Sequence, residues 1–181
     1  MERQISRTRS ADRFDVQRDS RLVSVRNAVV RFVRGDVPWV YVYGLPGNGK
    51  THLAAAAANH LLAQGRAVLF VTALELLAVI RDGFDSRRVE DLTGVCQRAP
   101  WLVVDDLGAE RRTDGAAEVL SRIFNARYVA RAHTLVASNV RPGDLAEPRL
   151  RSHFLDVAVC HRVPNGGDDY RQGKDRAGTD R

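Results

Sequence analysis

The segment from residue 44 to residue 51 reads GLPGNGKT and has the residue types of a phosphate-binding loop. Its eight residues are Gly44, Leu45, Pro46, Gly47, Asn48, Gly49, Lys50 and Thr51, in the spacing G-x-x-x-x-G-K-S/T. Glycines let backbone N–H groups converge on phosphate oxygens without interference from Cβ atoms. Lys50 is placed to reach the β- and γ-phosphates, and the Thr51 hydroxyl to bind Mg²⁺. The sequence therefore predicts a site for a magnesium-bound nucleoside triphosphate.

Two adjacent carboxylates, Asp105 and Asp106, follow the short apolar run of residues 101–104. Such a run is typical of a strand that is buried on both faces. A carboxylate at the end of this strand can hold the Mg²⁺ shell, and Asp105 is predicted to do so. Asp106 is predicted to be the base that orients the attacking water, and its side chain is one methylene shorter than the usual glutamate, which predicts slow hydrolysis. The alternative is a strand-end turn with solvated carboxylates.

A third polar position, Asn139, follows the β-branched and apolar run of residues 134–138. In ATPases with an extra strand between the two phosphate-site strands, a polar residue here contacts the γ-phosphate or the attacking water. We therefore predict that Asn139 senses the nucleotide. The alternative is a simple turn before the Arg-Pro-Gly sequence of residues 141–143.

Strands and helices alternate along the chain around these motifs. The predicted strands are residues 39–43, 67–72, 101–104, 134–138 and 157–163. The predicted helices are residues 14–34, 51–64, 74–81 and 114–130. This alternation predicts an α/β fold with a mostly parallel sheet. The phosphate loop lies between the first strand and the second helix, which is the context that the motif requires.

The domain organisation follows from length and composition. A chain of 181 residues is typical of one domain. We expect an ATPase core over residues 14–164, a basic flexible leader over residues 1–13 and a polar tail over residues 165–181. A helical lid domain is not expected, because too few residues follow the last predicted strand.

Charge and cysteine content restrict the class of protein further. The net charge is +6, and residues 1–34 hold nine arginines against four acidic residues. This basic leader is either a solvated segment or an arm that contacts a polyanion. No apolar run is long enough to span a membrane, and no secretory signal is present. Cys96 and Cys160 are far apart and indicate buried thiols rather than a metal site. These features favour a cytoplasmic protein.

Several strings in order along the chain resemble the DnaC/DnaI-type helicase loaders of the AAA+ superfamily. They are GKTHL at residues 49–53, LVVDDLGAE at 102–110, NARY at 125–128, the 134–139 strand and DYR at 169–171. The resemblance covers about residues 14–171, and it adds His52 to the nucleotide-binding residues. The IstB-type transposition ATPases are close relatives, although their acidic pair usually reads Asp-Glu.

This resemblance implies a three-layer P-loop NTPase fold with an ASCE core and a five-stranded parallel sheet of order 5-1-4-3-2. It also implies an ATPase that loads a ring-shaped replicative helicase onto single-stranded DNA. ATP would lie between neighbouring subunits of a homo-oligomer, where an arginine from the next subunit completes each site. Such an arginine can raise the rate by about 10³- to 10⁵-fold.

Three arginines are candidates for roles that the resemblance implies. The family carries its trans arginine in a string like Arg-x-x-Ser-Arg-Leu, and His153 occupies that position here. Arg149 or Arg151 is therefore expected to replace it. Arg171 resembles the second sensor, an arginine near the γ-phosphate.

Single-stranded DNA would be contacted by the segment between the second helix and the acidic strand. Arg81, Phe84, Arg87 and Arg88 lie there, and an aromatic residue among arginines suits base stacking combined with phosphate contacts. The alternative is a solvated loop with one packed phenylalanine, with any DNA contact made by the basic leader.

Two other classes of function are weighed against a helicase loader. A small-molecule kinase would need an arginine-rich lid and an acceptor pocket, and it would not need Asn139. A nucleotide-dependent assembly switch with little hydrolysis fits the short Asp106 and the presence of His153. A transposition helper of the IstB type is the remaining alternative.

Overall fold

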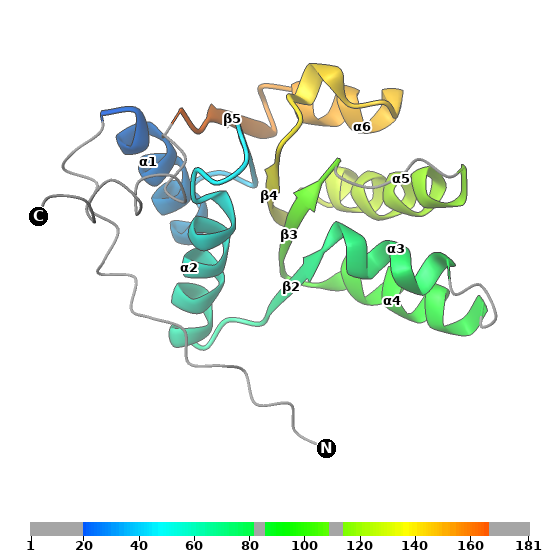
Figure 1. The fold of residues 1–181 in the computed structure, drawn as a ribbon. Coiled ribbons are helices and arrows are strands. Elements are labelled where there is room, and N and C mark those ends of the chain that lie inside the picture. The colour runs from blue at the N-terminus through cyan, green and yellow to red at the C-terminus, as the bar shows by residue number, and fades with distance from the viewer. Residues whose placement is uncertain (1–19, 82–85, 109–113, 167–181) are drawn as a thin grey trace, which may run out of the picture.

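The computed structural model describes residues 20–81, 86–108 and 114–166 (Figure 1). Its strands are β1 (Trp39–Tyr43), β2 (Val68–Thr72), β3 (Trp101–Leu107), β4 (His133–Ser138) and β5 (Cys160–Pro164). They form one parallel sheet in the order β2-β3-β4-β1-β5, which confirms the predicted order. Because all five strands run the same way, their carboxyl ends meet at one edge of the sheet.

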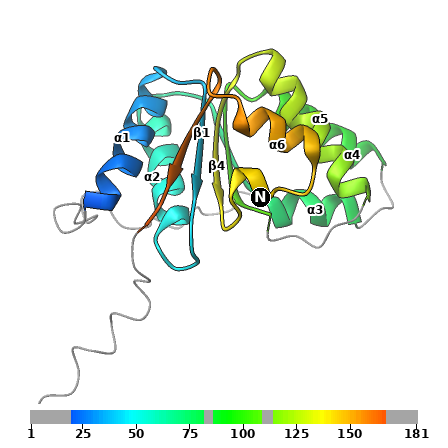
Figure 2. The same ribbon diagram turned by 90° about the horizontal axis from the view of Figure 1, so that it is seen from above.

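Helices cover both faces of the sheet, so the fold has three layers (Figure 2). Helices α1 (Ser20–Arg34) and α2 (Lys50–Ala63) lie on one face. The other face carries α3 (Ala73–Arg81), α4 (Ser86–Arg98), α5 (Asp114–Val129) and α6 (Pro148–Leu155). A short 3-10 helix, η3 (Pro142–Asp144), connects β4 to α6. No helix in the described ranges is both long and apolar enough to cross a bilayer.

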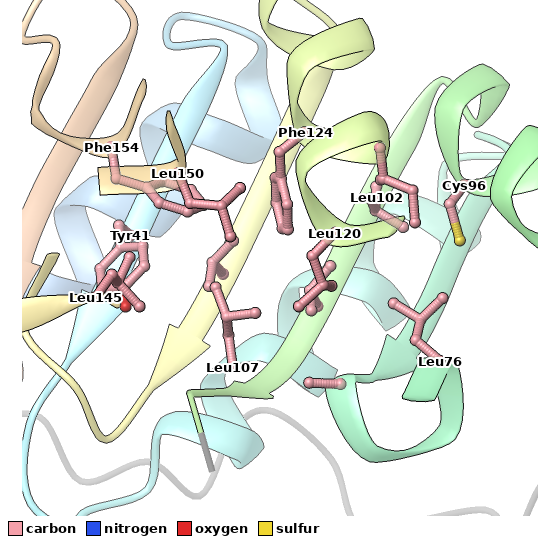
Figure 3. Packing of buried hydrophobic residues seen from close by; sticks show 14 of the residues in the cluster. Tyr41, Leu76, Cys96, Leu102, Leu107, Leu120, Phe124, Leu145, Leu150 and Phe154 are labelled. Carbon is pink, nitrogen blue, oxygen red and sulfur yellow. The ribbon is translucent and has the colours of Figure 1, made fainter. Parts of the chain in front are cut away.

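Each face of the sheet has its own hydrophobic core. On the first face, Phe32 of α1 and Leu61 of α2 belong to the same core as Val40 of β1, and all three are at most 1% exposed. On the other face, Phe124 of α5 and Phe154 of α6 pack with their ring centroids 5.1 Å apart (Figure 3). Burial of such rings removes a large apolar area from water and gives the sheet a rigid frame.

Two helices and two strands differ from the sequence-based expectation. Strand β3 continues through Asp105 and Asp106 to Leu107 instead of ending at residue 104. Helices α4 and α6 were not predicted. Strand β5 begins at Cys160 rather than at residue 157, because a turn at Asp156 precedes it. The Asp156 Oδ1 accepts a hydrogen bond from the Ala158 N–H at 2.8 Å, and the Asp156 carbonyl accepts one from the Cys160 N–H. These two bonds engage the backbone N–H groups of Ala158 and Cys160 within the turn, so the strand starts only after the turn.

Candidate nucleotide site at the carboxyl edge of the sheet

The phosphate loop connects β1 to α2 and is shaped by glycine. Gly47 and Gly49 have φ values of 82° and 87°, in the left-handed region that residues with a Cβ rarely adopt. Gly49 is the N-cap of α2, and no side chain caps that helix terminus. The first N–H groups of α2 are therefore available to an anion, and the helix dipole favours negative charge there.

Lys50 is the first residue of α2, and its ammonium group lies inside the loop. Its Nζ donates hydrogen bonds to the carbonyls of Gly44 and Leu45 at 2.8 and 2.7 Å, and to Asn48 Oδ1 at 3.0 Å. Burial lowers the pKa of Lys50, and the nearby carboxylates of Asp106 and Asp105 oppose this shift. The positive charge thus occupies the space where the phosphates of a nucleotide are expected.

Thr51 and Asp105 form a pair of oxygen ligands suited to Mg²⁺. The Thr51 hydroxyl donates to Asp105 Oδ1 at 3.3 Å, which joins the start of α2 to the end of β3. Burial raises the pKa of Asp105, while hydrogen bonds from Thr51 and from the Asp106 N–H lower it. Mg²⁺ prefers hard oxygen donors and takes only one or two from the protein when phosphates supply the others. The donor set therefore fits a magnesium–nucleotide complex.

Asp106 and Asn139 meet beside this pair. The Asn139 Nδ2 donates to Asp106 Oδ1 at 2.9 Å, across the ends of β3 and β4. Asp106 has a φ of 57°, which is unusual for a residue with a Cβ, and the β3–β4 register shifts between Val104 and Leu107. This bulge turns the Asp106 side chain to the edge where Asn139 lies. The two residues that were predicted to handle the attacking water are thus in direct contact.

The two arginines that are predicted to act in trans both lie on α6, and only one of them is exposed. Arg149 is exposed and Arg151 is half-buried. His153 stacks on Tyr128 of α5 with ring centroids 4.1 Å apart, and its Nε2 is buried without a hydrogen-bond partner. Burial and the charge of Arg149 lower the pKa of His153, so its ring is neutral at pH 7. A neutral ring packed within its own chain cannot supply positive charge to a neighbouring site.

The remaining predicted residues are only partly described. His52 is exposed on α2, and Arg87 is exposed on α4. Arg81 ends α3 and Arg88 lies in α4, but their side chains are outside the described part of the chain, as are all atoms of Phe84 and Arg171. The DNA contacts and the second sensor therefore stay predictions.

One buried residue at this edge, Asn165, has no functional signal in the sequence, where it falls in the predicted polar tail. Its side chain is 4% exposed and donates to the Asn48 carbonyl at 2.9 Å. Its backbone N–H continues the pairing of β5 with β1 by donating to the Tyr43 carbonyl. No local sequence pattern marks a residue whose partner is 117 positions away.

The sheet order and the residues at its carboxyl edge define a P-loop nucleotide-binding protein of the AAA+ class. Comparison with known families agrees: residues 8–177 match the family described as IstB-like ATP binding protein. The chain therefore belongs to this ATP-binding family.

Individual relatives include replicative helicase loaders. The chain is 28% identical over 107 residues to DnaC of Escherichia coli K12, covering 58% of this chain and 44% of DnaC. It is 28% identical over 116 residues to DnaI of Bacillus subtilis, covering 64% and 36% of the two chains. The chain thus matches less than half the length of these two relatives. A crystal structure of DnaI superposes with a TM-score of 0.75 at 23% identity, over 86% of this chain and 89% of that one.

Proposed function

We propose that the chain is an ATPase that binds MgATP at the carboxyl edge of the sheet and couples its binding and hydrolysis to assembly. The assembly would contain several copies of the chain, single-stranded DNA and a ring-shaped replicative helicase. One observation carries the nucleotide part of the proposal: Lys50, the Thr51–Asp105 pair and the Asp106–Asn139 pair all meet at one edge. Similarity to helicase loaders supports the assembly part.

The chain's own residues divide the work between binding and hydrolysis. The N–H groups of the phosphate loop and the Lys50 ammonium would bind phosphate oxygens, so Lys50 must exchange its present carbonyl partners for them. Thr51 and Asp105 would hold Mg²⁺, which supplies charge neutralisation at the phosphates when bound. Asp106 would accept the proton of the attacking water, and Asn139 would orient that carboxylate.

The nucleotide part is tested by separating binding from hydrolysis. Lys50→Ala should abolish binding of a fluorescent ATP analogue in the presence of Mg²⁺. Asp106→Asn should retain binding and lose about 10²- to 10⁴-fold in hydrolysis rate, the range typical of a lost general base. Asp36→Asn is the matched control, because Asp36 is exposed in the turn before β1. Equal affinity of wild type and Lys50→Ala would exclude the phosphate-loop assignment.

The assembly part is tested by stimulation. ATP hydrolysis per subunit should rise when single-stranded DNA and the replicative helicase of the same organism are added, and the helicase should be retained by the immobilised chain. Retention of a transposase instead of the helicase would favour the IstB-type transposition helper, which the family match supports.

A second candidate function is a nucleotide-dependent switch with little hydrolysis. Two observations favour it. His153, at the expected position of the trans arginine, is neutral and cannot supply charge, and the Asn139 amide already donates a hydrogen bond to Asp106 Oδ1, the oxygen that would otherwise accept a proton from water. Mixing distinguishes the two functions. An inactive Arg149→Ala/Arg151→Ala variant should regain activity with inactive Lys50→Ala, because each donates what the other lacks. A mixture that stays inactive while oligomers form would favour the switch.

A further inference from the structure

Asn48 in the phosphate loop and Asn165 after β5 exchange two hydrogen bonds. The Asn48 Nδ2 donates to the Asn165 carbonyl at 2.6 Å, and the Asn165 Nδ2 donates to the Asn48 carbonyl at 2.9 Å. Both residues are buried, at 1% and 4% exposed. We call this reciprocal pair the Asn48–Asn165 clasp. Buried amides are costly to leave without partners, so each half of the clasp stabilises the other.

The clasp fixes which way the Asn48 amide faces. Because its Nδ2 is held by the Asn165 carbonyl, its Oδ1 points the other way and accepts the hydrogen bond from Lys50 Nζ. A flipped amide would present its NH₂ group to the ammonium and its oxygen to a carbonyl, which are two repulsive contacts. The position of the Lys50 charge is therefore linked to the backbone carbonyl of Asn165 through the Asn48 side chain, while the Asn165 side chain holds the Asn48 backbone carbonyl and so keeps the two segments together.

Asn165 is itself anchored on the sheet. Its N–H donates to the Tyr43 carbonyl at 2.6 Å, one residue beyond the Val163 and Pro164 pairs of the β1–β5 ladder. The clasp thus ties the phosphate loop to the segment that leaves β5 and is still paired with β1. Rigid support of this kind reduces the entropy lost when a ligand is bound.

We propose that Asn165 is a positioning residue of the nucleotide site, acting through Asn48 on the phosphate loop and the Lys50 ammonium. This proposal rests on the proposed ATP-binding function. It assigns Asn165 no contact with nucleotide. It predicts that loss of its side chain loosens residues 44–51 in the free protein and weakens binding of every nucleotide whose phosphates the loop holds.

The test compares Asn165→Ala with Asn59→Ala, the same change at an exposed site on α2. Titration with fluorescent ATP and ADP analogues should show about tenfold weaker binding of both by Asn165→Ala, because binding must then re-order a loop that one buried hydrogen bond no longer holds in the free protein. Asn59→Ala should bind like the wild type. Asn48→Ala should weaken binding at least as much as Asn165→Ala, because it also removes the oxygen that faces Lys50.

Hydrogen exchange of the free protein provides a readout that does not need nucleotide. Amides of residues 44–51 should exchange faster in Asn165→Ala, while those of β3 and β4 keep their wild-type rates. Unchanged loop exchange, or faster exchange throughout the sheet, would overturn the positioning role. Asn165→Ser carries the same test if the alanine variant does not fold. Absence of ATP binding by the wild type would refute the proposed function. Hydrogen exchange of the free protein would still show whether the Asn48–Asn165 clasp holds residues 44–51 in place.

Discussion

Replacement of Arg127 should show how strongly one buried charge joins α5 to the rest of the fold. Arg127 is fully buried and donates to four well-placed acceptors: Thr134 Oγ1 at 2.9 Å and the carbonyls of Cys96, Ala99 and His133 at 2.7, 2.7 and 2.6 Å. Burial lowers the pKa of the guanidinium to about 10, so it is charged at pH 7. Two of these carbonyls lie at the C-terminus of α4, where the helix dipole favours a cation.

Arg127→Met keeps most of the volume and removes every donor. Hydrogen bonds to charged groups contribute about 1.5–3 kcal/mol each, and the loss of one partner of a buried polar network costs about 3–5 kcal/mol. We expect the free energy of unfolding to fall by about 3–5 kcal/mol, measured by urea denaturation at pH 7. Arg127→Lys should recover only part of this loss, because one ammonium cannot reach all four acceptors, which are divided between the C-terminus of α4 and the start of β4.

Arg122→Met is the matched control on the same helix. Arg122 forms a bidentate pair with Glu90 of α4 at 2.8 and 2.9 Å, but both side chains are largely exposed. Exposed ion pairs contribute little, so this variant should unfold at a urea concentration close to that of the wild type. An Arg127→Met variant that is no less stable than Arg122→Met would refute the reasoning. Nucleotide affinity should be unchanged in both, since Arg127 lies at the opposite edge of the sheet.

Three further predictions concern the nucleotide site. Gly44→Ala should lower the affinity for ATP more than about fivefold, because the added Cβ would overlap the backbone carbonyl of Asn165, just after β5. In the control variant Gly143→Ala, the added Cβ meets nothing within 4 Å, so this variant should bind ATP normally in the same titration. The affinity for MgATP should weaken as the pH falls, because a protonated Asp105 cannot hold Mg²⁺. The loss should begin at a higher pH than it would with an unperturbed aspartate, because the pKa of Asp105 is raised. On the alkaline side, the affinity for MgATP should weaken at a lower pH than it would with an unperturbed lysine, because the pKa of Lys50 is lowered. Calorimetric titrations over a range of pH measure both effects, and an affinity that does not change with pH would contradict both pKa shifts. Thr51→Ala should reduce the apparent Mg²⁺ affinity about 10- to 100-fold in the presence of ATP, and Thr51→Ser should restore it.

The carboxyl edge of the sheet was predictable because its candidate site residues come at or just beyond the ends of strands: Asp105 lies in the last part of β3, and Asn139 follows β4. Asp105 and Asn139 each follow a run of apolar and β-branched residues, and such runs mark where a strand ends. Parallel strands then place these ends at the same edge of the sheet whatever their order, and the pairing of β3 with β4 makes the ends neighbours. The order itself was available only from the family resemblance, because local periodicity carries no information on which strands pair.

Helices α4 and α6 were missed for two different physical reasons. Helix α4 is mostly polar, and its buried Thr93 and Cys96 become recognisable as a packed face only against α5. Helix α6 begins at Pro148, which suits the first turn of a helix but in a sequence also indicates a connection. The left-handed Asp106 had no sequence signal beyond the tolerance of aspartate for that conformation.

Both tryptophans of the chain begin a strand, and this placement limits what its intrinsic fluorescence can report. Trp39 starts β1 and Trp101 starts β3, so the two indoles lie at the amino edge of the sheet. A strand of five residues spans roughly 16 Å, which separates both rings from the phosphate loop. Trp101 also stacks on His133 with centroids 3.9 Å apart, and Trp39 is fully buried. Their emission should therefore follow unfolding closely yet stay unchanged when nucleotide binds, so binding has to be observed with a labelled nucleotide or by calorimetry.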